Sequence, residues 1–515
     1  MGSENFGTAI LRASVEFANL PALIKPDNNF RFSYADLAAR SEKYAAALRK
    51  LGACSGDRVA VQVDKSVEAL CLYVGCLRAG AVFLPLNTAY TVHEMAYFLN
   101  DARPRVVVCR PQDAEEISKV GRLAGISARE TLGSNGSGSL IGIVDEQMSG
   151  APDEPRAADD VAALIYTSGT TGRSKGAMVT HGNLASNAYA LKSAWKFTAQ
   201  DVLLHALPMF HIHGLFVAAN VSLLSGSSIL FLEGFDVNEI VGLLPSATVM
   251  MGVPTFYTRL LQHPSLNGQV CTGVRLFVSG SAPLLPETHR EWTRRTGHEI
   301  VERYGMTETG INTSNPLSGQ RLPGSVGLPL PGVQIRTTST ETGEPLPPEQ
   351  IGMLEVKGPN VFKGYWHMPG KTADSFTADR FFKTGDLGVI GEGGYVSIVG
   401  RDKDLIISGG YNIYPREIEI ELDALDGVVE SAVIGVPHLD LGECVVAIVA
   451  RAVGSQLTEK EILQKVSGRL ARFKLPRRIV FEQELPRNAM GKVQKNELRK
   501  RNVELFSHSH RPPSS

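Results

Sequence analysis

The sequence predicts an α/β protein with a large N-terminal domain, made of two α/β subdomains and a small β-barrel, and a small α+β C-terminal domain. Three observations support this prediction. The chain has 515 residues, which is too long for one ordinary domain. Short apolar runs alternate with amphipathic helical patterns through most of its length. The residue pattern changes near residues 324 and 401. We therefore expect domains at 1–401 and 402–515.

The first α/β region contains strong local signals. Ser33 and Asp36 form a capping-box pattern, which predicts a helix that ends at Gly52. Helices and short apolar strands then alternate, as in a largely parallel sheet with helical crossovers. The predicted strands are 58–63, 81–86 and 105–109, and the predicted helices are 67–79 and 92–99.

The remaining regions differ in texture. The second α/β region has predicted strands at 202–207, 228–232 and 274–279, and predicted helices at 237–244 and 255–261. Many Gly and Pro residues and short alternating runs between 324 and 400 indicate a small antiparallel barrel or sheet. The C-terminal region has predicted helices at 417–425 and 458–470, and predicted strands at 431–436, 445–450 and 479–482.

Composition excludes several classes of protein. The formal net charge is -1, so no overall positive field attracts nucleic acid or an anionic membrane. No apolar run approaches the ~18 residues that a membrane helix needs. The six cysteines form no C-x-x-C pair, and we expect them to be reduced and structural. With no secretory signal at the N-terminus, we expect a cytoplasmic protein.

The stretch 166–176 reads Y-T-S-G-T-T-G-R-S-K-G and follows an apolar, β-prone run. Its glycines allow backbone N–H groups to approach an anion, while its hydroxyls and its lysine add donors. It is not a Walker A loop, because no hydroxyl residue follows the lysine. We expect it to bind phosphate. The residues expected to do so are Thr167, Ser168, Gly169, Thr170, Thr171, Gly172 and Lys175.

Several motifs together resemble the adenylate-forming superfamily of acyl-CoA synthetases, firefly-type luciferases and peptide-synthetase adenylation domains. Besides 166–176, they are Y-G-M-T-E-T (304–309), Y-W (365–366), T-G-D (384–386), G-R-D-K-D-L-I-I (400–407), G-G-Y-N-I-Y-P-R-E-I-E (409–419) and P-R-N-A-M-G-K-V (486–493). The resemblance covers nearly the whole chain. It implies that the small C-terminal domain is mobile, that ATP and CoA are cosubstrates, and that Mg²⁺ is required.

The resemblance also implies roles for individual residues in ATP chemistry. Glu308 would be the Mg²⁺ ligand, with Thr170 beside it, and Thr307 would contact phosphate. Asp386 would accept the ribose hydroxyls, and Lys492 would stabilise the transition state of adenylation electrostatically. Further nucleotide contacts are expected from Ser281, Tyr304, Gly305 and Arg401.

In this superfamily the C-terminal domain rotates after adenylation. Lys403 matches the hinge position. The rotation would withdraw Lys492 from the active site and bring the glycine-containing loop after the hinge to it. The residues expected to line the CoA tunnel are Ser408, Gly409, Gly410 and Tyr411.

Within the superfamily the chain most resembles the malonyl-CoA synthetases, through M-F-H-I-H-G-L-F (209–216) and the segments 302–316, 356–367 and 485–497. A dicarboxylate needs a buried cation for its second carboxylate. Arg259 and Arg303 are the candidate cations, Met306 would close the pocket, His211 would gate it, and Ser281 would line it. His213 is expected to be structural.

Two other functions remain open. One is a CoA ligase for another small acid, such as methylmalonate, succinate or an aryl acid. The other is an adenylation module that loads a carrier protein, although no carrier site follows the C-terminal domain. We further expect Lys492 to be a target of a lysine acetyltransferase and deacetylase, since acetylation would remove its charge. The protein is expected to be a monomer or a homodimer.

Overall fold

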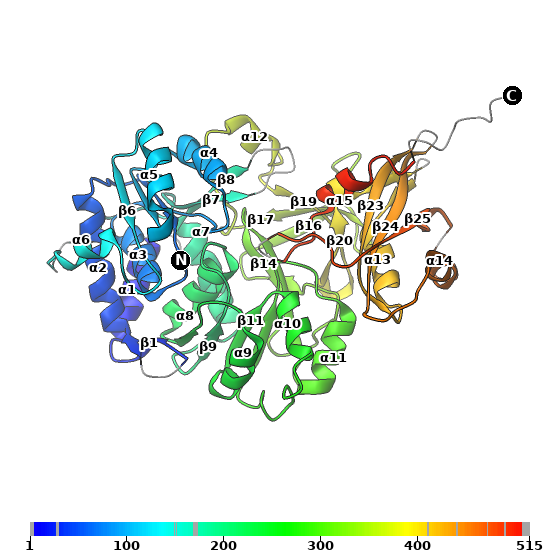
Figure 1. The fold of residues 1–515 in the computed structure, drawn as a ribbon, viewed down its shortest axis with the longest axis horizontal. Helices are drawn as coiled ribbons and strands as arrows, with labels where there is room; N and C mark the ends of the chain where they lie inside the picture. The colour runs from blue at the N-terminus through cyan, green and yellow to red at the C-terminus, as the bar shows by residue number, and fades with distance from the viewer. Residues whose placement is uncertain are drawn as a thin grey trace.

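The computed structural model in Figure 1 describes residues 5–26, 30–148, 150, 152–167, 174–408, 411–438, 441–470, 472–488 and 491–506, with the side chains of residues 411 and 412 left out. The chain forms four β-sheets. In Figure 1 the N-terminal region occupies the left and lower parts of the view, and the C-terminal region lies at the right.

The first sheet has seven strands in the order β18-β8-β7-β4-β3-β5-β6. The strands from β7 to β6 in this order are parallel, whereas β8 and β18 are antiparallel to their neighbours. The inner parallel strands β4 and β5 are apolar and fully buried, as expected of strands with both faces covered, whereas the edge strand β6 is mostly polar. The strands are β3 (Arg58–Gln62), β4 (Val82–Pro85), β5 (Val106–Cys109), β6 (Ala128–Thr131), β7 (Val161–Thr167), β8 (Lys175–Thr180) and β18 (Gly364–Tyr365).

The second sheet has nine strands in the order β15-β14-β13-β12-β11-β9-β10-β1-β2. The strands from β13 to β1 in this order are parallel, and both edges are antiparallel. The strands are β1 (Pro21–Ile24), β2 (Arg31–Ser33), β9 (Val202–His205), β10 (Ser228–Phe231), β11 (Val249–Gly252), β12 (Leu276–Ser279), β13 (Ile300–Met306), β14 (Gly310–Ser314) and β15 (Leu328–Pro329).

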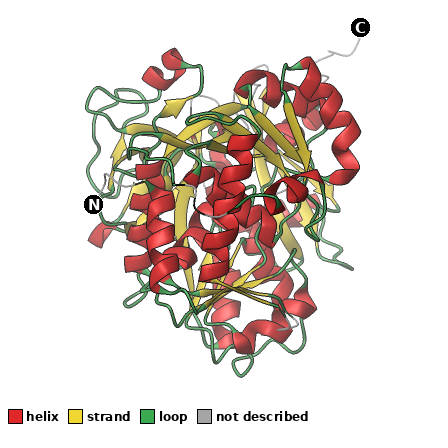
Figure 2. Ribbon diagram, turned by 90° about the vertical axis from the view of Figure 1, so that its left-hand side faces the viewer, coloured by secondary structure: helices red, strands yellow, loops and turns green. Residues whose placement is uncertain are grey.

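Helices connect these strands and pack on both sheets (Figure 2). Ser33 and Asp36 form the expected capping box at the start of α2. The helices are α1 (Phe6–Glu16), α2 (Tyr34–Lys50), α3 (Val67–Arg78), α4 (Val92–Ala102), α5 (Ala114–Leu123), α6 (Ser139–Asp145), α7 (His181–Ala194), α8 (Asn220–Ser225), α9 (Val237–Leu243), α10 (Pro254–Leu261) and α11 (Pro286–Thr296), with the 3₁₀ turns η1 (Pro111–Asp113) and η3 (Leu244–Ser246) and the π-helix η2 (His213–Ala219).

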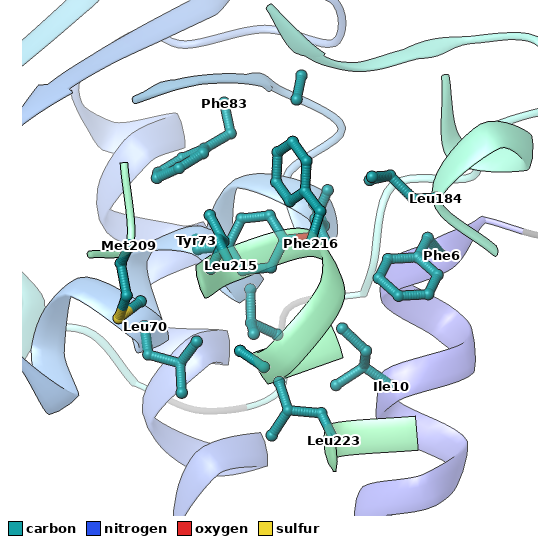
Figure 3. Packing of buried hydrophobic residues seen from close by; sticks show 14 of the residues in the cluster. Phe6, Ile10, Leu70, Tyr73, Phe83, Leu184, Met209, Leu215, Phe216 and Leu223 are labelled. Atoms are coloured by element: carbon teal, nitrogen blue, oxygen red, sulfur yellow. The ribbon is translucent and has the colours of Figure 1, made fainter. Parts of the chain in front are cut away.

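The largest buried cluster joins the two sheets through the helices between them. It contains Val59 of the first sheet and Leu203 of the second, together with aromatic residues from the intervening helices. Figure 3 shows Tyr73 of α3 beside Phe216 of the π-helix, with Phe6 of α1 farther along the same cluster. This core therefore fixes the π-helix against both sheets.

The glycine- and proline-rich segment forms a four-stranded antiparallel sheet in the order β16-β17-β19-β20. Within this fully described segment, no pairing of β20 with β16 closes it. The expected antiparallel unit is confirmed, and it takes the form of a sheet rather than a barrel. Its elements are β16 (Gln334–Thr338), β17 (Gly352–Lys357), α12 (Pro369–Asp374), β19 (Phe382–Ile390), η4 (Glu392–Gly394) and β20 (Val396–Arg401).

The C-terminal region forms a five-stranded sheet in the order β22-β21-β24-β23, with β25 parallel to β24. Its predicted α+β character is confirmed. The domain boundary at residue 401 and the hinge role of Lys403 stay predictions. The elements are η5 (Asp402–Asp404), β21 (Ile406–Ser408), β22 (Tyr411–Ile413), α13 (Pro415–Asp423), β23 (Val428–His438), β24 (Gly442–Arg451), α14 (Glu459–Ser467), η6 (Arg472–Lys474), β25 (Arg478–Glu482) and α15 (Lys495–Asn502).

Every helix and strand named from the sequence has a counterpart with shifts of a few residues at its ends. The π-helix was not foreseen, because nothing in its apolar sequence distinguishes it from an α-helix. Across the part of the chain that the structure describes, each helix is too short or too polar to cross a membrane.

Candidate active site

Asp386 lies at the centre of a buried polar group. Its Oδ1 is 2.9 Å from Nε of Arg401, its register partner on the neighbouring strand β20. Its Oδ2 accepts a 2.6 Å hydrogen bond from the Tyr304 hydroxyl at the end of β13. Asp386 raises the pKa of Arg401, so this guanidinium stays charged. The structure thus brings together three of the residues expected to bind the nucleotide.

Glu308 lies in a second buried group. Its Oε1 accepts a 3.0 Å hydrogen bond from the Tyr365 hydroxyl, and Nζ of Lys175 lies 5.3 Å from the centre of the Tyr365 ring. Burial raises the pKa of Glu308. Thr307 and Glu308 line one small cavity with Asn360. Lys175 begins β8 and pairs in register with Thr167 at the end of β7, so these two strands flank the predicted phosphate loop.

These residues suit Mg²⁺ bound with a nucleotide. Mg²⁺ is commonly held by one or two carboxylates together with substrate phosphates, rather than by a complete protein cage. Glu308 supplies one such carboxylate, and its hydrogen bond from Tyr365 leaves acceptor capacity on the other oxygen. Among the described side chains there is no cluster of three or more acidic, His or Cys ligands, which agrees with a site completed by substrate.

Lys492 lies in a tight loop that faces this region. Its backbone N–H donates to Oδ1 of Asn488 at 3.0 Å, and its carbonyl accepts from the Asn488 N–H at 2.9 Å. A Cβ built on the preceding Gly491 would lie 3.3 Å from Thr255 Oγ1 of α10, so the loop touches the N-terminal region. Partial burial and Arg401 lower the pKa of Lys492 to about 8, although the side chain as a whole remains exposed. The expected catalytic lysine therefore lies near Asp386 and Arg401.

Arg303 is buried without any acidic partner among the described residues. Its side chain is 4% exposed, and Nε and Nη2 make no hydrogen bond with any residue that the structure describes. The guanidinium packs against Gly280, where an added Cβ would lie 2.4 Å from Cζ. Burial lowers the pKa of Arg303 to about 9. Since an uncompensated buried charge is costly, this arginine is suited to receive an anion.

Two histidines adjoin Arg303. Burial and the charge of Arg303 lower the pKa of His211 to about 4, and the same two causes hold the pKa of His213 well below its ordinary value. His213 is fully buried, its Nδ1 lies 3.2 Å from Ser281 Oγ, and its Nε2 has no partner within the described chain. Ser281 adopts a left-handed φ of 73°, a strained conformation of the kind that occurs at functional sites. His213 thus adjoins Ser281 and Arg303, and its expected structural role stays a prediction.

Other expected residues lie elsewhere or are not described. Arg259 is exposed on the last turn of α10, with its guanidinium 5.9 Å from the Phe235 ring, so it does not join Arg303 in this structure. Met306 packs with the aromatic cluster around Tyr365. An added Cβ on Gly305 would collide with the Gly310 carbonyl, at 2.1 Å.

The hinge and CoA residues lie on the C-terminal side of this site. Lys403 lies in η5, where burial lowers the pKa of its amine, and Ser408 ends β21. The following expected residues lie outside the described residues or side chains: Ser168, Gly169, Thr170, Thr171, Gly172, Gly409, Gly410 and the Tyr411 side chain.

Comparison with protein families gives two matches along the chain. Residues 11–366 match the AMP-binding enzyme family, and residues 417–492 match the AMP-binding enzyme C-terminal domain. The first match includes Arg303, Tyr304 and Glu308, and the second ends at Lys492. Asp386 and Arg401 lie between the two matches.

Similar proteins include several CoA ligases. Mitochondrial malonate–CoA ligase ACSF3 of Bos taurus is 34% identical over 540 residues, covering 97% of this chain and 90% of that protein. A feruloyl-CoA synthase of Amycolatopsis sp is 36% identical over 475 residues, covering 91% and 94%. The crystal structure of ATP-bound MatB from Rhodopseudomonas palustris is 53% identical, with a TM-score of 0.95, and covers 98% of this chain and all of that one.

Proposed function

Because the chain belongs to the AMP-binding enzyme family, we propose that it is an ATP-dependent malonate–CoA ligase. In the first half-reaction a malonate carboxylate attacks the α-phosphorus of ATP, and pyrophosphate leaves. In the second, the thiol of CoA attacks the acyl carbon of malonyl-AMP, AMP leaves, and malonyl-CoA forms. The similarity to malonate–CoA ligases supports this choice of acid.

The buried guanidinium of Arg303 is the observation that carries the proposal. A neutral aliphatic or aryl acid would leave this charge without a partner, at a cost of several kcal/mol. The second carboxylate of malonate would compensate the charge and accept from the two unpaired nitrogens. Half-buried His211 and fully buried His213, whose pKa values lie below the usual range of histidine, are neutral there and do not compete for the anion.

The remaining groups would position ATP and stabilise its transferring phosphate. Asp386 would accept the ribose hydroxyls while Tyr304 and Arg401 hold its carboxylate in place. Lys175 and the loop before it would bind the β- and γ-phosphates. Glu308 would hold Mg²⁺, which neutralises charge on the phosphate oxygens. The Lys492 ammonium would stabilise the negative charge that develops between the acid and the α-phosphate.

The second half-reaction would need a different face of the C-terminal region. We propose that rotation about Lys403 withdraws Lys492 and brings the segment after Ser408 to the site, where it would line a tunnel for the CoA thiol. The loss of contact between Gly491 and Thr255 would accompany this rotation.

Three further assignments belong to the same proposal. We propose a cytoplasmic location, which fits six cysteines that form no disulfide. We propose a monomer or homodimer. We also propose that acetylation of Lys492 regulates adenylation, because it would remove the charge that this step requires.

The test is thioester formation with ATP, Mg²⁺ and CoA across a panel of acids. We expect kcat/KM for malonate to exceed that for acetate, benzoate and ferulate by at least about 100-fold. Methylmalonate should fall within about 10–200-fold of malonate, since one methyl changes binding by only 1–3 kcal/mol. A preference for acetate or benzoate would refute the proposal.

A further inference from the structure

A half-buried lysine, Lys65, contacts the strand that leads to the segment carrying His213. Lys65 is in the turn between β3 and α3, and its Nζ donates to the carbonyl oxygen of His205 at 2.7 Å. The same Nζ lies 2.7 Å from His205 Nδ1 and 4.6 Å from the centre of the Phe231 ring. No carboxylate of the described chain forms an ion pair with it. None of the steps proposed above uses this lysine.

His205 relays this contact to the π-helix. Its side chain is 2% exposed at the end of β9, and its Nε2 lies 2.8 Å from the carbonyl oxygen of Gly214. Because a carbonyl can only accept, Nε2 carries the proton and Nδ1 accepts from Lys65. The lysine therefore fixes both the tautomer and the orientation of the imidazole.

Gly214 packs closely against a second backbone carbonyl, that of Pro208. A Cβ built on it would lie 2.1 Å from the Pro208 carbonyl oxygen, so only glycine fits there. Gly214 is the second residue of the π-helix, directly after His213. A π-helix is rare and is frequently found at functional sites. The hydrogen bond from His205 therefore holds the turn that carries His213.

His213 in turn contacts the strained turn beside Arg303. Its Nδ1 lies 3.2 Å from Ser281 Oγ, and the preceding Gly280 packs directly on the Arg303 guanidinium. A continuous set of polar contacts thus runs from Lys65 through His205 and the π-helix to the turn that covers Arg303.

We propose that Lys65 and His205 are positioning residues for acid binding, which act by holding the Gly214 carbonyl and hence His213 and Ser281. The proposal rests on the proposed function in so far as the acid is malonate. It predicts a defect in acid binding and none in ATP binding, because the groups around Asp386 and Glu308 share no contact with Lys65.

Conservative substitutions at His205 provide the sharpest test. His205→Gln retains an N–H donor near the position of Nε2 but lacks the acceptor for Lys65. His205→Asn retains polar atoms near Nδ1 but cannot reach Gly214. We expect the Asn variant to raise KM for malonate about tenfold, the scale of one lost buried hydrogen bond, and the Gln variant to stay within about threefold of the wild type. KM for ATP should change less than about twofold in both.

Lys65→Met tests the other end of the relay. Like His205→Gln, it loses the contact at Nδ1 but keeps a donor to Gly214, so it should raise KM for malonate by about two- to threefold. The double variant Lys65→Met/His205→Asn should be no worse than His205→Asn alone, because both act through the Gly214 carbonyl. Lys50→Met is the matched control: Lys50 pairs with Glu146 at the surface, 2.7 Å apart, and its loss should change neither KM.

The outcomes separate this inference from the proposed function. Turnover of malonate by the wild type is measured first; if another acid is used instead, the same KM comparisons are made with that acid. Equal effects of Gln and Asn at His205, or a rise in KM for ATP that matches the rise for the acid, would overturn the positioning role. If Lys65→Met does not accumulate in folded form, the two His205 variants decide the question by themselves.

Discussion

Replacement of Arg303 by methionine should separate acid recognition from the stability of the fold. The wild-type side chain is 4% exposed and has two unpaired nitrogens. Burial lowers its pKa from the ordinary value of arginine to about 9, which at 1.36 kcal/mol per pKa unit corresponds to roughly 5 kcal/mol of destabilisation by the buried charge. Methionine is apolar and flexible enough to fill the space. We therefore expect Arg303→Met to stabilise the ligand-free protein by about 1–4 kcal/mol.

The same substitution should abolish discrimination in favour of malonate. Removing one member of a buried charge pair costs about 2–5 kcal/mol, which is a loss of roughly 30- to 5000-fold in kcat/KM. Activity with a neutral acid such as propionate should fall much less. The assays are pyrophosphate release with each acid and urea denaturation of the ligand-free protein.

The pH dependence of stability gives an independent check. The folded-state pKa of Arg303 lies below its unfolded-state value, so above about pH 9 the unfolded chain binds more protons than the folded one. The destabilisation of the wild type by the buried charge of Arg303 is therefore complete below about pH 9 and decreases as the pH rises above it. The stability advantage of the methionine variant should therefore diminish above pH 9.

Arg275→Met is the matched control. Arg275 forms two 2.7 Å contacts with the buried carboxylate of Asp201, so its loss should destabilise the protein and leave the preference for malonate intact. If Arg303→Met destabilises the protein as much as Arg275→Met, or retains malonate kcat/KM within about threefold, the reasoning about Arg303 is refuted.

Three further predictions concern the other groups. Lys492→Ala should abolish adenylate formation while CoA thioester formation from supplied malonyl-AMP persists; equal loss of both half-reactions would contradict the role given to this lysine. Because burial and Arg401 lower the pKa of Lys492 to about 8, kcat/KM for adenylation should decline as the pH rises through 8, whereas a flat profile to pH 10 would argue against it. Tyr365→Phe removes a buried 3.0 Å hydrogen bond to Glu308 and should weaken Mn²⁺ binding in the presence of ATP about 3- to 30-fold, as measured by electron paramagnetic resonance. Arg259→Ala tests whether this exposed side chain reaches the acid during turnover: selective loss of malonate activity would support that role, and a uniform loss would place Arg259 outside the acid site.

Much of the site could be predicted from the sequence because its signals are local. Glycine and hydroxyl residues before Lys175 indicate phosphate binding whatever surrounds them. The expected strand before this loop is present, and it pairs with a second strand that begins at Lys175. Glu308, Asp386 and Lys492 each lie in a motif whose residue types suit one task. The structure adds that Asp386 and Glu308 are buried with partners supplied by Tyr304, Arg401 and Tyr365.

The sequence could not decide which of the two candidate arginines, Arg259 or Arg303, is buried in the acid site. Each follows an apolar segment, and neither segment indicates which side chain will be covered. Arg303 is buried because Gly280, on the turn after β12, leaves room for its guanidinium at the end of the neighbouring parallel strand β13. Arg259 lies on the solvent side of α10, because Tyr257 and Leu260 occupy the buried side.

By itself, then, the sequence determined the order of the elements, the chemistry of the phosphate loop and the family resemblance, since periodicity and motif spacing are properties of short segments. Only the tertiary structure decided that Arg303 is the buried cation without an acidic partner, that His213 belongs beside it, and that Lys65 holds the π-helix from another sheet. These facts depend on contacts between residues far apart in the chain. The free energy of burying a charge depends on which of those contacts form.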